Sequence, residues 1–199
     1  MTLVDTDGRG PDRITPRGVV VGEVEIPLDC LVFATGFSVG ADSMLGSGVV
    51  VIGRDGISLV EKWSAEPASL HGIASNGFPN LFVLRAAQAA FTVNFPHLLD
   101  EQSRHVAYIV AEAAARDATV VEASREAEDE WVAAITARAG TSVTFHSTCT
   151  PGYFNNEGHA DDRDSRTSFY GAGSAAYFGE LARWRADGTL GGLELRSGQ

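Results

Sequence analysis

One apolar run constrains the fold of this chain more than any other feature. Asp29 to Phe37, with the sequence DCLVFATGF, shows no alternation of polar and apolar residues and ends in small residues and glycine. Such a run is typical of a β-strand buried on both faces, as in a parallel sheet covered by helices. The sequence therefore predicts an α/β protein.

Further strands are expected near this run, because other short β-branched segments are bounded by turn residues. They are a hairpin over Gly18–Pro27, a strand pair at 49–52 and 57–60 that turns at Arg54-Asp55-Gly56, and a buried strand over Asn80–Leu84. Residues up to Thr15 are polar and indicate a loop or an extended entry.

The second half of the chain has helical periodicity. Helices are expected from Pro96 to Arg116, from Ser124 to a stop at Gly140, and from Gly173 to Ala186 with Gly188 as its end. The core face of the first helix would carry Leu98, Leu99, Gln102, Val106, Ile109, Val110 and Ala113, and Asn94 would cap it. Core faces of the other two would carry Trp131, Ala134, Ile135, Tyr177, Leu181 and Trp184.

Length and charge exclude several classes of protein. The 199 residues suffice to bury a core, and a net charge of −11 argues against a nucleic-acid partner, which requires a basic face. No apolar run approaches the about 20 residues of a membrane span, and no signal peptide is visible. Cys30 and Cys149 lie far apart, which favours a reducing, cytoplasmic compartment.

Several chemical patterns are weak. Gly171 to Ala176 satisfies GxGxxA, but no buried strand precedes it, so a flexible helix entry is the better interpretation. The five histidines lack ligand spacing, so no metal site is expected. Glu101 and His105, one turn apart, indicate a surface ion pair. Asp161-Asp162-Arg163-Asp164 is compatible with a cation site and, more often, with a solvated loop.

Two places are typical of ligand binding. The strand ending in Ala34-Thr35-Gly36 would let a bulky ligand approach its backbone at the carboxyl end, where open α/β sheets bind ligands. Gln88 to Asn94 precedes a helix whose first N–H groups and positive dipole suit an electron-rich ligand. The alternative is an α/β core with two tight strand–helix turns and no ligand.

At these residues the sequence resembles Baeyer–Villiger monooxygenases, which are class B flavoproteins that use FAD and NADPH. The resemblance rests on an ordered set of segments that covers essentially the whole chain. They are Leu3–Thr6, Asp29–Phe37, Gly77–Phe82, Asn94–Gln102, Glu128–Trp131, Cys149–Gly158 and Trp184–Gly188. The family's two GxGxxG fingerprints, its FxGxxxHxxxW signature and its active-site arginine are absent from the sequence.

The resemblance implies the C-terminal portion of a flavoprotein with two dinucleotide-binding domains. Residues 1–28 would leave the NADPH domain, 29–120 would complete the FAD domain, and 121–199 would form a helical segment with a mobile loop at about 146–172. Contacts with FAD would come from Ala34, Thr35, Gly36, Phe37, Gln88, Thr92 and Asn94. No catalytic residue is expected in this portion.

In the family, NADPH and FAD activate O₂ to convert a ketone into an ester or lactone. The resemblance therefore implies a small-molecule ketone substrate and, as a partner, the missing N-terminal portion, without which we expect no activity. Ala86-Ala87 stands where the family usually has Gly-Pro, or Gly followed by another small residue, and the added Cβ atoms would weaken flavin binding. The alternative is a non-catalytic, degenerate remnant or a partner-binding α/β module.

Overall fold

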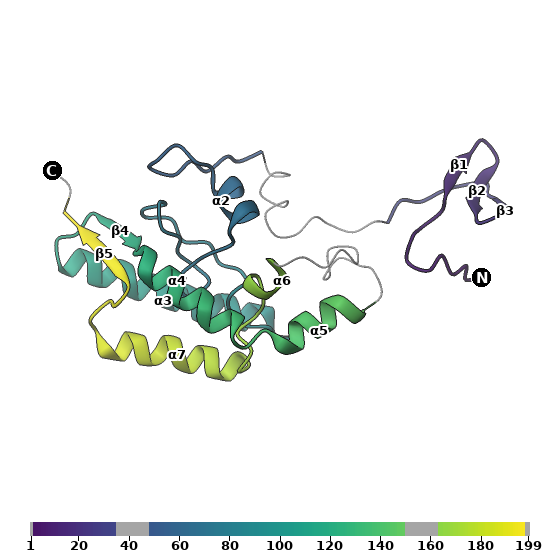
Figure 1. Cartoon of the computed structure of the whole chain (residues 1–199). Helices are drawn as coiled ribbons and strands as arrows, with labels where there is room; N and C mark the ends of the chain where they lie inside the picture. Colours follow the sequence, from purple (N-terminus) through teal and green to yellow (C-terminus); the bar gives the residue numbers. More distant parts are fainter. Residues whose placement is uncertain (1, 35–47, 150–162, 198–199) are drawn as a thin grey trace.

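The computed structural model describes residues 2–34, 48–149 and 163–197, and Figure 1 shows their course. Five strands and six helices lie in these ranges. They are β1 (Arg13–Thr15), β2 (Gly18–Val21), β3 (Val24–Pro27), α2 (Leu59–Ala65), α3 (Phe95–Ala115), β4 (Val120–Ala123), α4 (Arg125–Thr136), α5 (Gly140–Thr148), α6 (Arg163–Arg166), α7 (Ser174–Asp187) and β5 (Leu193–Arg196).

The N-terminal strands form an antiparallel sheet in the order β1-β2-β3. The predicted hairpin is confirmed, since β2 pairs with β3 and Val21 opposes Val24 across a two-residue turn. Gly18 is required where the strands meet, because a Cβ at this position would lie 1.9 Å from the carbonyl oxygen of Ile26. β1 adds a third strand in the segment for which the sequence indicated a loop or an extended entry.

The predicted buried strand at Asp29–Phe37 is wrong for residues 29–34, and residues 35–37 lie outside the described ranges. Val32 and Phe33 are 78% and 72% exposed. A parallel strand needs hydrogen-bonded neighbours and a covered face. Among the described residues no strand pairs with this segment, so its apolar side chains face solvent.

The other predicted strands are also wrong. Residues 49–60 form only a single bridge between Ile52 and Ser58, and Ser58 caps α2 in a capping box with Glu61. A local helix start thus prevails over the β-branched pattern. Residues 80–84 make single backbone bonds instead of a ladder, since the Asn80 N–H donates to Val121 O of β4 and the Val83 N–H donates to Ile73 O of a loop.

The α/β class is nevertheless confirmed, and β4 supplies the buried strand. Its last three residues, Val121, Glu122 and Ala123, are buried, and it pairs antiparallel with β5. The three-part division of the chain at residues 28 and 120 stays a prediction.

The three predicted helices are present as α3, α4 and α7. Asn94 and Ser124 cap the first two, and Gly188, with φ +70°, ends the third. The predicted stop at Gly140 is wrong, because α4 ends at Thr136 and Gly140 begins α5. Gly140 does not adopt the positive φ with which glycine ends helices.

The buried face of α3 follows the predicted stripe with two exceptions. Val110 is exposed, and His105 is fully buried. The predicted surface ion pair between Glu101 and His105 is therefore wrong. Because α7 packs over this part of α3, the His105 ring contacts Trp184 at 4.8 Å, while Glu101 pairs with arginines.

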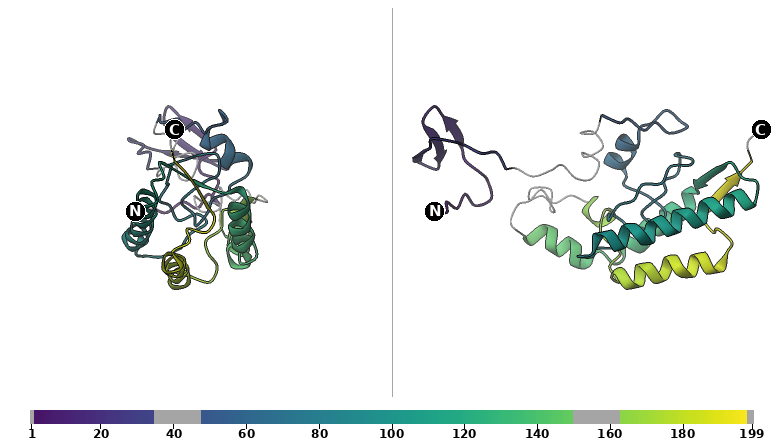
Figure 2. Two further views of the ribbon diagram at one scale, coloured as in Figure 1. Left: turned by 90° about the vertical axis from the view of Figure 1, so that its left-hand side faces the viewer. Right: turned by 180° about the vertical axis from the view of Figure 1, so that it is seen from behind.

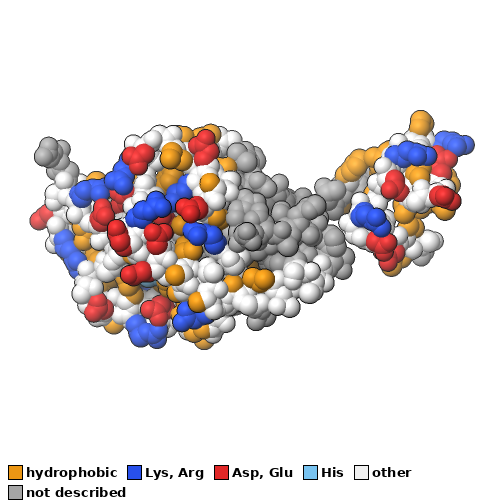
Figure 3. All heavy atoms as spheres, in the orientation of Figure 1, with side chains coloured by type: hydrophobic (Ala, Val, Ile, Leu, Met, Phe, Trp, Pro, Cys, Tyr) orange, Lys and Arg blue, Asp and Glu red, His pale blue; other side chains and the backbone are white. Residues whose placement is uncertain are grey.

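The main core lies between α3, α4 and α7, and α3 and α7 run side by side (Figure 2). A smaller cluster of Leu59, Trp63 and Phe78 lies beneath α2. On the face shown in Figure 3, positive and negative side chains are interspersed over the helical part. Among the described residues, no helix has the length and apolar character needed to cross a membrane.

Candidate functional site

The N-terminal end of α3 is the predicted ligand-binding position that the structure describes most fully. The Asn94 side chain accepts a hydrogen bond from the backbone N–H of His97 at 3.3 Å, which fixes the first turn. Twenty-one residues of helix follow, so the electropositive end of their dipole lies at this exposed turn.

Apolar side chains surround this turn. Phe91 and Val93 are 61% and 102% exposed, and the Phe91 ring packs against Phe169 with 4.8 Å between centroids. Thr92, half-buried, stands between them, and Asn94, exposed, follows Val93. An apolar surface with a few polar groups and a helix N-terminus is suited to a planar, electron-rich ligand.

Gln88, the first residue of this segment, is fully buried. Its Oε1 accepts a hydrogen bond from Ser69 Oγ, and its Nε2 donates to the carbonyls of Pro67 (3.0 Å) and Arg166 (2.7 Å). These bonds use both polar atoms of the amide. In this structure the Gln88 side chain therefore holds three segments together and is not directed at a ligand.

The backbone around Gln88 is anchored as well. Its carbonyl accepts a hydrogen bond from Trp131 Nε1 at 2.9 Å, and its N–H donates to Ser168 O at 3.0 Å. The segment that leads into α3 is thus attached to α4 and to residues 166–170. The exposed turn at 91–94 consequently stands on a rigid base.

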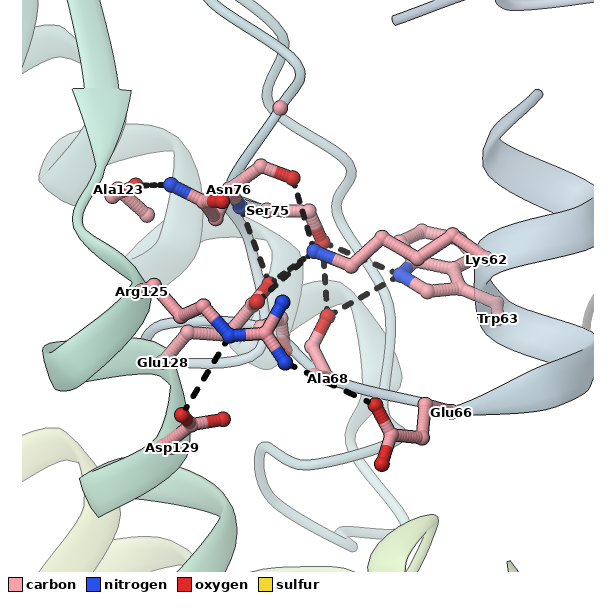
Figure 4. A network of polar contacts seen from close by, with 12 residues as sticks. Lys62, Trp63, Glu66, Ala68, Ser75, Asn76, Ala123, Arg125, Glu128 and Asp129 are labelled. Atoms are coloured by element: carbon pink, nitrogen blue, oxygen red, sulfur yellow. Dashed lines mark hydrogen bonds and ion pairs between the residues drawn. The ribbon is translucent and has the colours of Figure 1, made fainter. Parts of the chain in front are cut away.

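A polar network behind this base is drawn in Figure 4. Lys62 of α2 lies 2.8 Å from both carboxylate oxygens of Glu128 of α4 and also donates to Asn76 O. Asn76 donates from its backbone to Glu128 and from its side chain to Ala123 O. The network joins α2, β4 and α4 through the loop 68–76, which carries Ser69, the partner of Gln88.

Arg85 strengthens the same region. Its guanidinium stacks 3.7 Å from the Trp63 ring centroid, and burial lowers the pKa of Arg85 to about 10. The group thus keeps its charge at neutral pH. Gln102 of α3 bonds both the N–H and the carbonyl of Arg85, which ties this segment to the helix.

The remaining predicted flavin contacts lie partly inside and partly outside the described residues. Ala34 is exposed at the end of a described range, whereas Thr35, Gly36 and Phe37 lie outside the described residues. The full set of seven flavin contacts therefore stays a prediction. Of the loop predicted at about 146–172, residues 150–162 lie outside the described residues, and α5 and α6 occupy parts of the rest.

One group of side chains has the composition of a metal site. His97, Asp100 and Glu101 have ligand atoms within 4.8 Å of one another. Arg104 already lies 3.1 Å from Asp100 and 3.9 Å from Glu101, so a cation would compete with this arginine. We therefore assign no metal ion to this group.

Sequence reasoning missed a buried histidine pair. His71 Nδ1 lies 3.1 Å from His105 Nε2. Burial lowers the pKa of His71 to about 4, and burial together with His71 and Arg185 lowers the pKa of His105 to about 3. Both rings are thus neutral at pH 7. A signal existed, because His105 lies on the same helical stripe as Gln102 and Ile109.

Comparison with known proteins decides the relationship of the chain. No family model matches it. It is 46% identical over 200 residues to neopentalenolactone D synthase of Streptomyces avermitilis, and 50% identical over 189 residues to a Baeyer–Villiger monooxygenase of Streptomyces coelicolor. The chain is homologous to the C-terminal portion of Baeyer–Villiger monooxygenases.

The chain spans only about a third of these relatives. The two alignments cover 100% and 94% of this chain but 34% and 31% of the Streptomyces proteins. Solved structures show the same partial coverage. Polycyclic ketone monooxygenase from Thermothelomyces thermophila superposes with a TM-score of 0.82 at 39% identity, covering 98% of this chain and 32% of that one. A steroid monooxygenase bound to NADP gives 0.79 at 26% identity, over 99% and 36%.

Proposed function

We propose that this chain is the C-terminal portion of an FAD- and NADPH-dependent monooxygenase that converts ketones to esters or lactones with O₂. The observation that carries the proposal is identity of 46–50% to Baeyer–Villiger relatives over nearly the whole chain. Such identity does not favour the alternative of a degenerate remnant or an unrelated partner-binding module. The absent partner of the reaction is then the remaining two thirds of the enzyme.

The residues at the α3 N-terminus fit one side of a flavin site. FAD, when bound, supplies the oxygen chemistry. Thr92, Asn94 and the first turn of α3 would hold an electron-rich edge of the ring, because the positive end of the helix favours negative charge. Phe91 and Val93 would exclude water. Gln88 is assigned a positioning role, since its side chain is fully hydrogen-bonded within the chain.

Other parts of the proposal rest on the resemblance alone. Ala34 to Phe37 would pass beside the FAD, and the loop at about 146–172 would fold over NADP and substrate. No catalytic residue is assigned to this chain. A cytoplasmic location is proposed from the two widely spaced cysteines, which suit a reducing compartment.

A chimera tests the function. The upstream two thirds of the Streptomyces coelicolor relative would be joined to this chain, and the purified protein would be assayed with cyclohexanone and cyclopentanone. We expect NADPH oxidation coupled to a product heavier by one oxygen atom. The 199-residue chain alone should show no conversion.

Two outcomes would contradict the proposal. One is a folded chimera that retains FAD yet oxidises NADPH without forming lactone from any ketone in a broad panel. The other is NADPH-dependent oxygenation by the isolated chain. A chimera that carries the two substitutions Ala86→Gly and Ala87→Pro serves as a matched control, and it should retain more flavin than the unaltered chimera.

A further inference from the structure

A groove of about 550 Å³ separates α4 from α7, away from the turn at 91–94. One face of α4 and one face of α7 form its sides, and the loop at His71 forms its floor. Three aromatic rings, those of Trp131, Tyr170 and Trp184, stand in its lining. We propose that this groove binds a small neutral aromatic molecule bearing a carbonyl oxygen, held by His71.

The position of His71 points to a ligand. Its backbone has φ +54°, a strained conformation for a residue other than glycine, although the residue is buried. Buried Gln88 and Leu190 have similar φ values, so this backbone is one that the surrounding packing enforces, and the case for a ligand rests on where the ring lies. The ring is wedged between Trp131 (4.9 Å) and Trp184 (5.4 Å), edge to face with each.

The histidine pair sets which atom faces the groove. His71 Nδ1 is engaged by His105 Nε2, so Nε2 of His71 is the ring nitrogen left for a ligand. Behind the pair, His105 Nδ1 is buried with no hydrogen-bond partner, as is Nη1 of Arg185. Arg185 lies close enough to lower the pKa of His105, so its positive charge acts on that ring.

The charge of Arg185 favours one direction of hydrogen bonding in the histidine pair, although Arg185 Nη1 and His105 Nδ1 are not hydrogen-bonded to each other. A guanidinium can only donate, so a charge beside His105 favours the tautomer with Nδ1 as acceptor. His105 Nε2 then carries the proton and donates to His71 Nδ1. His71 must consequently carry its own proton on Nε2, which makes it a donor to the groove. A carbonyl oxygen is the matching acceptor.

Charge at the rim excludes an anion. Glu130, Glu180 and Asp187 line the groove, with Glu180 already paired with Arg183, and among the described residues the one cation in the lining is Arg138. The Arg138 guanidinium lies over the Tyr170 ring at 5.5 Å and donates to Ala134 O, so it is already engaged. A carboxylate would meet net repulsion, whereas a neutral ketone or amide would not.

The inference is independent of the proposed function, because it requires neither flavin nor NADPH. The 199-residue chain with the substitutions Val32→Ser and Phe33→Ser, which remove two exposed apolar side chains far from the groove in sequence, would be titrated with acetophenone and followed by saturation-transfer NMR and calorimetry. We expect saturable binding with a Kd on the order of 1 mM or tighter. Ethylbenzene, which lacks the oxygen, should bind at least about tenfold more weakly, a loss of about 1.4 kcal/mol, and benzoate should not compete.

Variants make the test specific. His71→Asn keeps a residue that tolerates positive φ and should weaken acetophenone binding at least about tenfold. His97→Asn, at an exposed histidine of α3, is the matched control and should bind normally. Ala134→Phe, a change on the groove side of α4, should block binding while sparing the histidine pair.

Clear results would overturn the assignment. They are equal binding of ethylbenzene and acetophenone, normal binding by a folded His71→Asn or Ala134→Phe variant, or no saturable binding by the folded chain. Imidazole ¹⁵N chemical shifts give a further check, because His71 should be protonated on Nε2.

Discussion

At the scale of single residues, Gln88 shows how one buried amide can join segments that are distant in sequence. Replacing it by leucine would leave the carbonyls of Pro67 and Arg166 without their donor. We expect Gln88→Leu to lower the free energy of unfolding by about 2–4 kcal/mol, since buried unpaired polar groups cost about 1–3 kcal/mol each. Urea unfolding measures this. Thr92→Ser, in the same segment, should change stability by less than about 0.5 kcal/mol.

The buried histidine pair makes stability depend on pH. Both pKa values, about 4 for His71 and about 3 for His105, lie below the ordinary value of 6.5. The unfolded chain therefore binds protons that the native chain does not. The contribution of the histidine pair to the free energy of unfolding is complete above pH 6.5. It falls as the pH drops from 6.5 toward 4, by up to about 1.4 kcal/mol per pH unit for each histidine.

Unfolding midpoints between pH 7.5 and 4.5 would measure this dependence. In a folded His71→Asn, His105→Gln double variant, the change in unfolding free energy per pH unit should be smaller, because two protons fewer are taken up on unfolding. An unchanged slope in that variant would show that the pair does not titrate as described.

At the scale of elements, the capping side chain of α3 is open to a simple test. Asn94→Ala removes the acceptor for the His97 N–H and should lower the free energy of unfolding by about 1 kcal/mol. Asn94→Ser keeps an acceptor and should recover most of it. Denaturant midpoints of both variants compare the two. Equal loss in both would mean that the cap contributes nothing and that packing alone fixes this end of the helix.

The ion pair between α2 and α4 allows a sharper experiment. Lys62 and Glu128 are largely buried and 2.8 Å apart. Lys62→Met leaves the Glu128 carboxylate without its cation and should cost about 3–5 kcal/mol, because an unpaired buried charge is strongly unfavourable. The double variant Lys62→Met, Glu128→Gln should be more stable than Lys62→Met alone. If the single change costs no more than the double, the pair is not coupled.

At the scale of the whole molecule, the exposed apolar residues are the main feature. Val32, Phe33 and Val93 are largely exposed, and Phe91 remains 61% exposed although its ring packs against Phe169. Exposed apolar surface of this kind marks an interaction face or an aggregation site. It is consistent with a chain that spans a third of its relatives.

We therefore expect the unaltered isolated chain to aggregate or to form a molten state, so the unfolding measurements described above are made in the Val32→Ser, Phe33→Ser background. Dye binding to exposed apolar surface and the loss of near-UV circular dichroism would report it. The double variant Val32→Ser, Phe33→Ser should be more soluble, whereas Val24→Ser, at an exposed valine of the β2–β3 hairpin, serves as the control. A sharp cooperative melt of the soluble, unaltered monomer would contradict this expectation.

Much of the helical part could be predicted from the sequence alone. The period of apolar residues, the caps at Asn94 and Ser124, and the glycine at 188 are local signals, and a helix makes its backbone hydrogen bonds within itself. The hairpin at Gly18–Pro27 was predictable for the same reason, because its partner strand is adjacent in sequence. The ordered segments that resemble Baeyer–Villiger monooxygenases also gave the family.

Tertiary structure alone decided the rest. The run at Asp29–Phe37 has the composition of a buried strand, but a parallel strand requires neighbours that no local segment supplies. Burial of His105 depends on α7 and on the loop at His71, which are distant in sequence. The saturated amide of Gln88 and the groove between α4 and α7 likewise arise only when separate segments pack together. Local hydrogen bonding can be read from sequence, whereas non-local pairing and burial depend on which partners are present.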